Sequence, residues 1–387
     1  MKAVIEIFTS FFLLGLHSFG GPAAHIGYFK KAFVDEKKWL SDQDYQGLVA
    51  LSQMLPGPGS SQVGFALGLK RAGLAGGIAA FLGFTLPSFL LLFGLALYSQ
   101  GQQPDWLQAV IHGLKLLAVV VVVDAVLNMY RSFCQTRLLT AMAVFSAAAL
   151  LLLPGVLTQF AVFIVAGAVC LIWHKTALTN AGDSGAMKIR VWPLGLFLVL
   201  FLALPWLAQF GSSWALFNDF YQAGSLVFGG GHVVLPLLEQ GLQGQVSQDT
   251  FLFGYAVAQA VPGPMFSLAA FLGAYLELSP FWGALLATLA IFLPGLLLVL
   301  AFLQSWQQLS LKPWFASASA GINAAVVGLL LAALYQPVFT SAVQGPIDMV
   351  GVMIGLFLLR IIKLKVLWLV LLALLWSGIG YQFFGLV

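Results

Sequence analysis

The chain has 387 residues, of which 61% are hydrophobic and 8% are charged, and its formal net charge is +4. Soluble domains carry about 25% charged residues, so this chain has too few to cover a water-facing surface of its size. The composition excludes a soluble enzyme, a nucleic-acid-binding protein and a disordered protein, and it predicts an all-α polytopic membrane protein. The two cysteines lie in or beside apolar stretches and predict neither a disulfide framework nor a metal cluster.

The N-terminal apolar segment begins a pattern that returns in the second half of the chain. Residues 11–22 correspond to residues 220–231, and each stretch contains Phe-Gly-Gly. Gln53-x-x-Pro56-Gly57-Pro58 corresponds in the same way to Gln259-x-x-Pro262-Gly263-Pro264. Because order and offset are kept, the pattern indicates a duplication. We therefore expect the first apolar segment to be a structural element and not a cleaved leader.

The duplication divides the chain into a first repeat, 1–174, a cytoplasmic loop with a linking span, 175–213, and a second repeat, 214–387. Apolar stretches that fit about 30 Å of hydrocarbon lie at 73–98, 107–129, 137–153, 157–173, 191–210, 281–303, 314–335, 346–361 and 366–386. Four further apolar segments are interrupted near their middle by Phe-Gly-Gly or Pro-Gly-Pro, and these are 4–33, 45–69, 217–240 and 251–276.

The positive charges predict how these segments thread the membrane, since Lys and Arg near span ends mark the cytoplasmic side. Lysines between residues 30 and 38 and the turn Lys70-Arg71 flank segment 45–69. Both are cytoplasmic if that segment enters and returns as a hairpin of two half-helices; a full crossing is the alternative. Continuing the count places the N-terminus in the cytoplasm and the two halves in opposite orientations. This inverted repeat is a common transporter architecture, with the binding site between the repeats.

The interrupted segments are the predicted site. Proline and glycine break a helix, and broken backbone inside a bilayer is tolerated only where protein or a water-filled cavity satisfies it. A half-helix that begins after such a break directs free N–H groups and its positive dipole end inward, and anions bind there without a formal charge. The alternative is that these residues are ordinary kinks and packing glycines. The predicted substrate-binding residues are Phe19, Gly20, Gly21, Pro22, His25, Gln53, Pro56, Gly57, Pro58, Gly59, Ser60, Ser61, Phe228, Gly229, Gly230, Gly231, Gln259, Pro262, Gly263, Pro264 and Ser267.

Other polar residues carry weaker hypotheses. Gln53 and Gln259 could donate to a ligand or cap the broken backbone. Lys30 and Arg71 are either topology signals or a cytoplasmic funnel that attracts an anion. Asp124 lies within a long span, which makes it a candidate for coupling to a proton or cation. His17, His112 and His232 are scattered, and we expect each to be a packed or interfacial residue.

The motifs Phe19-Gly20-Gly21-Pro22, His25-x-Gly27-Tyr28-Phe29 and Gln53-x-x-Pro56-Gly57-Pro58 resemble the signature of the chromate ion transporter family. The duplication resembles its long-chain, two-domain members. The resemblance implies export of chromate across the inner membrane of a bacterium or archaeon, chromate resistance, and sulfate as the structural analogue. The second half has Gly231 in place of Pro22 and no equivalent of His25, so we do not expect equal contributions from the two halves.

Export of a dianion from a negative interior is favoured by about 4.6 kcal/mol per 100 mV, at about 2.3 kcal/mol per charge. The sequence has no G-x-x-x-x-G-K-[ST] motif, and we expect no cofactor and no metal. The expected partners are an oxyanion and the lipid bilayer, with a homodimer left open. Uptake or exchange of sulfate or another oxyanion, and an anion channel, are the alternative functions. An intramembrane hydrolase is disfavoured because Ser60 and Ser61 lie in no G-x-S-x-G elbow and H-E-x-x-H is absent.

Overall fold

The structure is a computed structural model that describes residues 1–19, 21–99, 105–173, 189–229, 231–277, 279–306 and 312–384. Within these ranges the regular structure is entirely helical, with no strand. Five of the helices are long and apolar enough to cross a membrane. The expected all-α membrane fold is therefore confirmed.

The helices of the first half follow the predicted segments closely. They are α1 (Lys2–His17), α2 (Gly21–Phe29) with a π-helical continuation (Lys30–Glu36), α3 (Asp42–Met54), α4 (Gly59–Ser99), α5 (Asp105–Phe133), α6 (Arg137–Leu152) and α7 (Val156–Trp173). The linking helix is α8 (Val191–Leu207), and a short 3-10 turn, η3 (Ala208–Phe210), ends it.

The second half repeats this order. Its elements are α9 (Ser212–Leu226), η4 (Gly231–Val233), α10 (Val234–Gly241), α11 (Gln248–Ala260), η5 (Met265–Ser267), α12 (Leu268–Leu276), α13 (Pro280–Phe302), α15 (Pro313–Ala333), η6 (Leu334–Phe339), α16 (Thr340–Ala342), α17 (Pro346–Arg360) and α18 (Val366–Phe384). The predicted span 314–335 thus continues through η6 and α16 to Ala342.

Each interrupted segment is a pair of short helices. A crossing needs about 20 helical residues, whereas α1 has 16 and α3 has 13. The half-helix that starts at Gly59 runs into the following span, so both lie in α4, but the backbone leaves helical geometry at Ala72 and Gly73. Gly73 has a φ of +63°, a conformation that glycine adopts without strain. The second half separates the same two parts as α12 and α13.

Matching polar residues begin the second half-helix pair of each repeat. The Ser41 hydroxyl accepts a hydrogen bond from the Asp44 amide at 3.1 Å, and the Ser247 hydroxyl accepts one from the Thr250 amide at 3.2 Å. A serine N-cap satisfies one of the amides left free at a helix start. These caps explain why α3 and α11 begin at equivalent positions.

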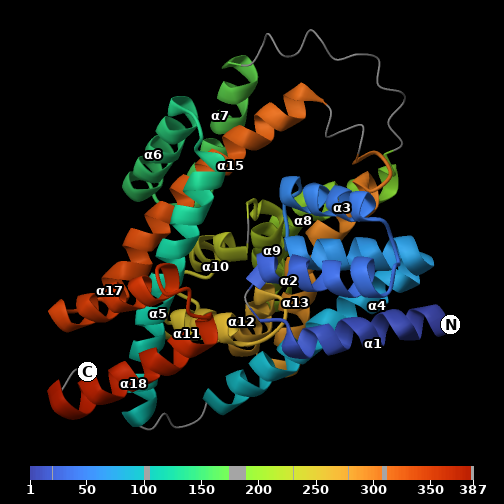
Figure 1. Cartoon of the computed structure of the whole chain (residues 1–387). Helices are drawn as coiled ribbons and strands as arrows, with labels where there is room; N and C mark the ends of the chain where they lie inside the picture. Colours follow the sequence, from blue (N-terminus) through green and yellow to red (C-terminus); the bar gives the residue numbers. More distant parts are fainter. Residues whose placement is uncertain are drawn as a thin grey trace.

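Small residues allow helices of opposite halves to pack closely against each other. A Cβ on Gly113 would meet the Ala373 carbonyl oxygen, and one on Gly321 would meet that of Ala166. Gly113 and Gly321 are repeat equivalents, as are Ala166 and Ala373, so α5 packs on α18 in the way that α15 packs on α7. Such close backbone approach is how helices associate in lipid. Figure 1 shows the resulting group α5, α6, α7, α15, α17 and α18 on the left, and α1 to α4 with α8, α9 and α13 on the right.

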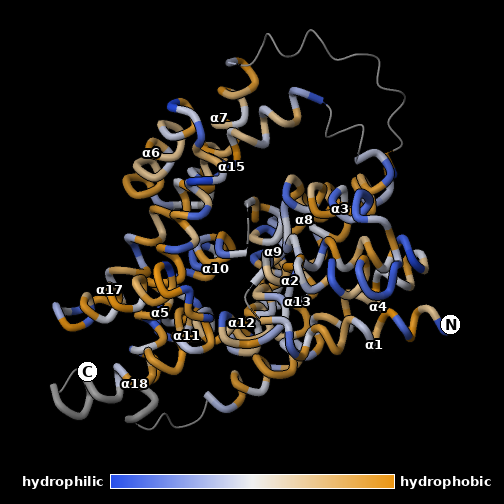
Figure 2. Tube along the Cα trace, in the orientation of Figure 1, coloured by the Kyte–Doolittle hydropathy of each residue, from blue (hydrophilic) through white to orange (hydrophobic). Residues whose placement is uncertain are grey.

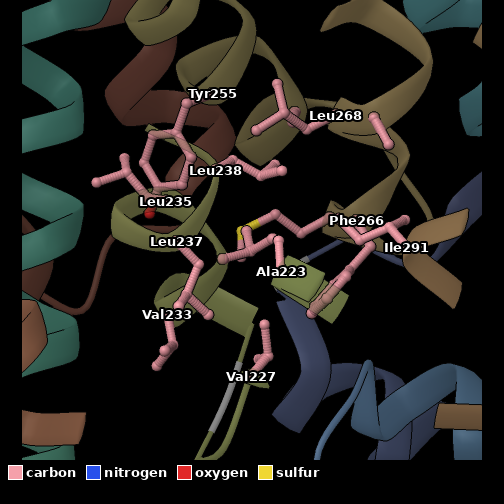
Figure 3. Close-up of a cluster of buried hydrophobic side chains, with 14 of the residues drawn as sticks. Ala223, Val227, Val233, Leu235, Leu237, Leu238, Tyr255, Phe266, Leu268 and Ile291 are labelled. Atoms are coloured by element: carbon pink, nitrogen blue, oxygen red, sulfur yellow. The ribbon is translucent and has the colours of Figure 1, made fainter. Parts of the chain in front are cut away.

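The surface and the interior have the distribution expected in a bilayer. Phe145, Ile164 and Leu202 are each more than half exposed on outer helices. Figure 2 shows hydrophobic colour along most helices and hydrophilic residues near helix ends and around α3. Figure 3 shows a cluster of buried hydrophobic side chains of the second half, in which Val227 and Phe266 lie among aliphatic side chains. This packed apolar layer fixes the backbone of the site described next.

Candidate functional site

The Pro-Gly-Pro turn of each half lies against the Phe-Gly-Gly break of the other half. The Gly57 amide donates to the Val227 carbonyl oxygen at 2.7 Å, and the Gly263 amide donates to the Ser18 carbonyl oxygen at 3.0 Å. Gly57 and Gly263 are repeat equivalents, and so are Ser18 and Val227. The two hydrogen bonds are therefore one contact made twice, related by an approximate two-fold axis. Through them the breaks of both halves share one interface.

Pro22 and Gly231 mark where this axis passes. They are repeat equivalents, yet a Cβ on Gly231 would lie 3.3 Å from Pro22 Cγ and 2.8 Å from the Met265 methyl group. Equivalent residues touch each other only close to a two-fold axis. Since the space beside Gly231 is already filled, a second proline would not fit, which explains this departure of the second half. The neighbouring predicted residues Gly20 and Gly230 lie outside the described residues.

Glycine is required in both Pro-Gly-Pro turns for two reasons. Gly57 has a φ of +126° and Gly263 a φ of +100°, which other residues rarely adopt. A Cβ on Gly57 would lie 2.8 Å from Gly295 Cα, and one on Gly263 would lie 3.0 Å from Ser88 Oγ. Gly295 and Ser88 are themselves equivalent, each following the proline inside the long helix of its half. The turn of each half is thus seated on the long helix of the other.

The first half-helix begins beside these contacts with two buried serines. Ser60 and Ser61 are each 3% exposed, and Ser61 Oγ has no hydrogen-bond partner. The first hydrogen bond along the new helix runs from the Gln62 amide to the Pro58 carbonyl oxygen at 2.9 Å. The preceding amides therefore have no partner within the helix. The unpaired hydroxyl and the free amides at this buried helix start are donors from which an anion can accept hydrogen bonds.

Gln62 supports the first break, and the sequence analysis did not single it out. Its Nε2 donates to the Pro56 carbonyl oxygen at 2.9 Å and to the Gly295 carbonyl oxygen at 3.3 Å. It is fully buried. Its repeat equivalent is Leu268, so comparing the two halves did not indicate a functional residue at this position. The available signal was a glutamine in the first turn after Pro-Gly-Pro.

His25 ties the first break to the half-helix. Its Nε2 lies 3.1 Å from the Ser18 carbonyl oxygen and its Nδ1 lies 3.3 Å from Ser60 Oγ. A carbonyl can only accept, so Nε2 carries the proton, and Nδ1 accepts from the Ser60 hydroxyl. Ser18 O therefore receives two donors, His25 and Gly263. Because both ring nitrogens are engaged within the protein, His25 positions the break.

The second half uses a different set of side chains. Ser267 Oγ lies 2.7 Å from Ser88 Oγ. His232 Nδ1 lies 3.0 Å from the Tyr255 hydroxyl and 3.4 Å from Gln259 Nε2. His232, expected from the sequence to be a packed or interfacial residue, therefore lies in a polar cluster with the predicted residue Gln259.

The matching glutamines differ in their surroundings. Gln259 is partly buried and also contacts the Met265 sulfur, whereas Gln53 is exposed. Neither donates to the broken backbone; Gln62 does. The other predicted residues flank the turns: Pro58, Pro262 and Pro264 are buried, Pro56, Gly59, Phe228 and Gly229 are partly buried, and Phe19 is exposed.

The two cations of the predicted funnel are both paired with acids. Lys30 Nζ lies 2.7 Å from Asp42 Oδ1, and the hydrogen bond from Lys30 lowers the pKa of the Asp42 carboxyl below its ordinary value. Arg71 lies 3.8 Å from a Glu6 carboxylate oxygen and over the Trp39 ring. These pairs reduce the positive field at that face, although both lysine and arginine remain partly exposed.

Asp124 forms an ion pair that joins the two halves. Arg360 Nε donates to Asp124 Oδ1 at 2.7 Å, and Asn128 Nδ2 donates to Asp124 Oδ2 at 2.9 Å. Both carboxylate oxygens of Asp124 are therefore engaged within the protein. The pair connects α5 to the end of α17.

Two further polar pairs on α5 were missed from the sequence. Lys115 Nζ lies 2.7 Å from Asp249 Oδ1, and His112 Nε2 lies 2.8 Å from Asp348 Oδ1. Lys115 is only 6% exposed within a span. A lysine inside the apolar run 107–129 was the signal, because charged residues within spans are costly and usually functional.

Fold and site together define a class: a polytopic helical membrane protein of two homologous halves whose broken helices meet at one shared, donor-rich interface. The comparisons with known proteins give the family. The chromate transporter family matches residues 5–173 and 214–379, and the chain belongs to this family. No solved structure matches the chain.

Relatives of this chain span most of its length. It is 30% identical over 347 residues to a protein of Synechococcus elongatus named "Probable chromate transport protein", covering 84% of this chain and 82% of that protein. It is 29% identical to the "Chromate transport protein" of Pseudomonas aeruginosa, over 90% of this chain and 84% of that protein. The "Uncharacterized transporter MJ0718" of Methanocaldococcus jannaschii is 28% identical, over 98% and 94%.

Proposed function

We propose that this protein exports chromate from the cytoplasm across a prokaryotic inner membrane, with sulfate competing for the same site, and that it confers chromate resistance. One observation carries the proposal: reciprocal hydrogen bonds from Gly57 and Gly263 bring the broken helices of both halves to one interface. The names of the relatives from Synechococcus and Pseudomonas support chromate as the substrate.

The chemistry of the interface suits a tetrahedral dianion. Moving a dianion out of water is costly unless donors replace its hydration. The start of α4 offers the amides of Gly59, Ser60 and Ser61 and the free Ser61 hydroxyl, and the helix dipole adds positive potential. Sulfate has nearly the same shape and charge, so we expect it to bind in the same manner.

Export requires no ATP in this scheme. The membrane potential favours exit of a dianion by about 4.6 kcal/mol per 100 mV, at about 2.3 kcal/mol per charge. Uptake would have to overcome this term through cation coupling, for which Asp124 is the candidate. The ion pair of Asp124 with Arg360 favours potential-driven export, since Arg360 and Asn128 already occupy the two carboxylate oxygens that a coupling cation would need.

Inside-out vesicles with an imposed potential of either sign test the proposal. We expect labelled chromate to accumulate when the vesicle interior is positive, to saturate, to show counterflow, and to be blocked by sulfate. Accumulation that follows a proton or sodium gradient would instead indicate coupled oxyanion transport, and flux without saturation or counterflow would indicate a channel. Sulfate flux without chromate flux would indicate that the substrate is sulfate and not chromate, while leaving the proposed location of the site unchanged.

A further inference from the structure

The two halves pack differently against the bundle formed by α5 and α15. On one side, α11 packs against α5, and η4 and α10 pack against α15. Repeat symmetry relates these contacts to α3 with α15 and to α2 with α5, yet among the described helices neither pair packs comparably. In Figure 1, α3 stands apart from α15. The structure is thus closed on the α11 side, predicted to be extracytoplasmic, and unpaired on the α3 side, predicted to be cytoplasmic.

A buried cation on α5 is paired with an acid of α11 at the closed side. Lys115 Nζ lies 2.7 Å from Asp249 Oδ1, with the two side chains 7% and 66% exposed. The equivalent positions in the opposite halves are Asn323 for Lys115 and Gln43 for Asp249. The repeat-related contact would therefore join two uncharged amides. Among the described residues, the pair Lys115–Asp249, called the latch below, therefore has no charged equivalent at the matching positions on the α3 side.

The position equivalent to Lys115 shows where such a side chain lies on the unlatched side. Asn323 is 6% exposed, and its Oδ1 has no hydrogen-bond partner. This oxygen would lie 3.2 Å from a Cβ on Gly229, so Asn323 is directed at the second break. A buried, unpaired polar atom directed at the break shows that this position on α15 faces the candidate site.

We infer that Lys115 is a further residue of the oxyanion site. In the repeat-related state, in which each half adopts the packing that the other half has in this structure, Lys115 leaves Asp249. It then faces the first break, as Asn323 faces the second break in this structure. This inference rests on the proposed function, because it supplies the formal positive charge that the site for a dianion otherwise lacks among the described residues at the breaks.

The order of transport events follows from this exchange of partners. A ligand favours the state that it binds more tightly. A dianion at the breaks gains Lys115 in the opposite state, so it drives opening of the α11 side. Once the anion has left, Asp249 is again the available partner for Lys115, and the empty protein returns to the state seen here. The latch thereby makes opening depend on substrate.

Cross-linking between Gln43→Cys and Asn323→Cys in the full-length protein tests the exchange. The pair retains Lys115 and Asp249, and the native thiols Cys134 and Cys170 are buried. We expect a bifunctional thiol reagent to link the pair slowly in vesicles without substrate and several-fold faster with saturating sulfate. Lys115→Met should remove the acceleration by sulfate. Asp249→Asn should raise the rate without sulfate several-fold.

The matched control is Glu36→Gln, which removes one negative charge from an exposed pair with Lys31 at 3.9 Å and should leave both rates unchanged. Acceleration by sulfate that persists in Lys115→Met would overturn the role of Lys115 at the site. An unchanged basal rate in Asp249→Asn, or no cross-link in any background, would overturn the latch. If Asp249→Asn raises the basal rate while neither sulfate nor chromate has an effect in any variant, the latch stands and the proposed oxyanion function fails.

Discussion

In the first half, His25 contacts Ser18 O and Ser60 Oγ, and Gln62 donates to Pro56 O and Gly295 O. The second half has Val234 and Leu268 at those positions and has instead the Ser88–Ser267 contact and the cluster of His232 with Tyr255 and Gln259. The contact between the halves is the same in both, because Gly57 and Gly263 make equivalent hydrogen bonds. The comparison teaches that this contact was retained after duplication while the side chains that support it diverged.

The largest predicted effect separates the two turn glycines. Gly57→Ala and Gly263→Ala should each abolish chromate flux, because both backbones have positive φ and both Cβ atoms would be crowded. A Cβ on Gly263 would be crowded by the Ser88 side chain, whereas a Cβ on Gly57 would be crowded by the Gly295 backbone as well as by Gln62 Nε2. Ser88→Gly should therefore restore part of the flux of Gly263→Ala. Chromate flux into vesicles measures these effects, with membrane insertion and folding of each variant checked separately. Full activity of Gly57→Ala would refute the requirement for glycine in this turn.

Next in size is the removal of the first-half support. Gln62→Leu copies the residue of the second half and leaves two buried carbonyl groups without their donor. Each buried unsatisfied group costs about 1–3 kcal/mol, so the unfolding midpoint in detergent should fall clearly. Gln135→Leu, at an exposed site, is the control and should change it little. Equal midpoints for the two variants would show that Gln62 does not hold the break.

The equivalent serines Ser61 and Ser267 should give opposite results. Ser61 Oγ has no partner, so Ser61→Ala should leave the thermal midpoint unchanged and raise the KM for chromate several-fold. Ser267→Ala loses its contact with Ser88 at 2.7 Å and should cost about 1 kcal/mol of stability. Thermal unfolding and flux measured on the same preparations decide this. An unchanged KM for Ser61→Ala would remove its hydroxyl from the site.

The smallest effect belongs to the cytoplasmic cations. Lys30→Ala should raise the apparent KM modestly at low salt, because it removes positive potential near the entrance. The pKa of Asp42 is lowered from about 3.8 by the hydrogen bond from Lys30. The Lys30–Asp42 ion pair therefore contributes to stability above pH 4, and this contribution is lost as the pH falls through the lowered pKa of Asp42. Below that pH Asp42 is neutral and no longer offsets the charge of Lys30, so the difference in KM between wild type and Lys30→Ala should widen; a difference in KM that persists in high salt would count against a funnel.

Much of the fold could be predicted because its signals are local. Apolar runs, the basic turns and the repeated Pro-Gly-Pro and Phe-Gly-Gly motifs located almost every helix. The join of 59–71 to 74–99 within α4 and the extension of α15 through η6 to Ala342 were not predicted, because neighbouring helices decide whether a chain bends or stops at glycine and proline.

Less of the site could be predicted, since its support comes from contacts between residues far apart in sequence. Gln62 and Lys115 bind groups in the opposite half, and no local pattern distinguishes such residues from packed ones. The breaks that repeat were visible; their partners were not. Comparison of the halves also favoured residues present in both. Gln62 and His232 each occur in one half alone, so Gln62 was overlooked and His232 was expected only to be a packed or interfacial residue.

Pro22 against Gly231 has a consequence for the history of the chain. A residue on a two-fold axis faces its own copy, so a half-length protein that paired with an identical partner would set proline against proline in a space that holds one. Fusion of two copies into one chain allowed the two positions to mutate separately. In the present pair, the Pro22 ring occupies the space and Gly231 contributes only a hydrogen atom. Only a fused or hetero-dimeric protein can encode two different residues at these positions.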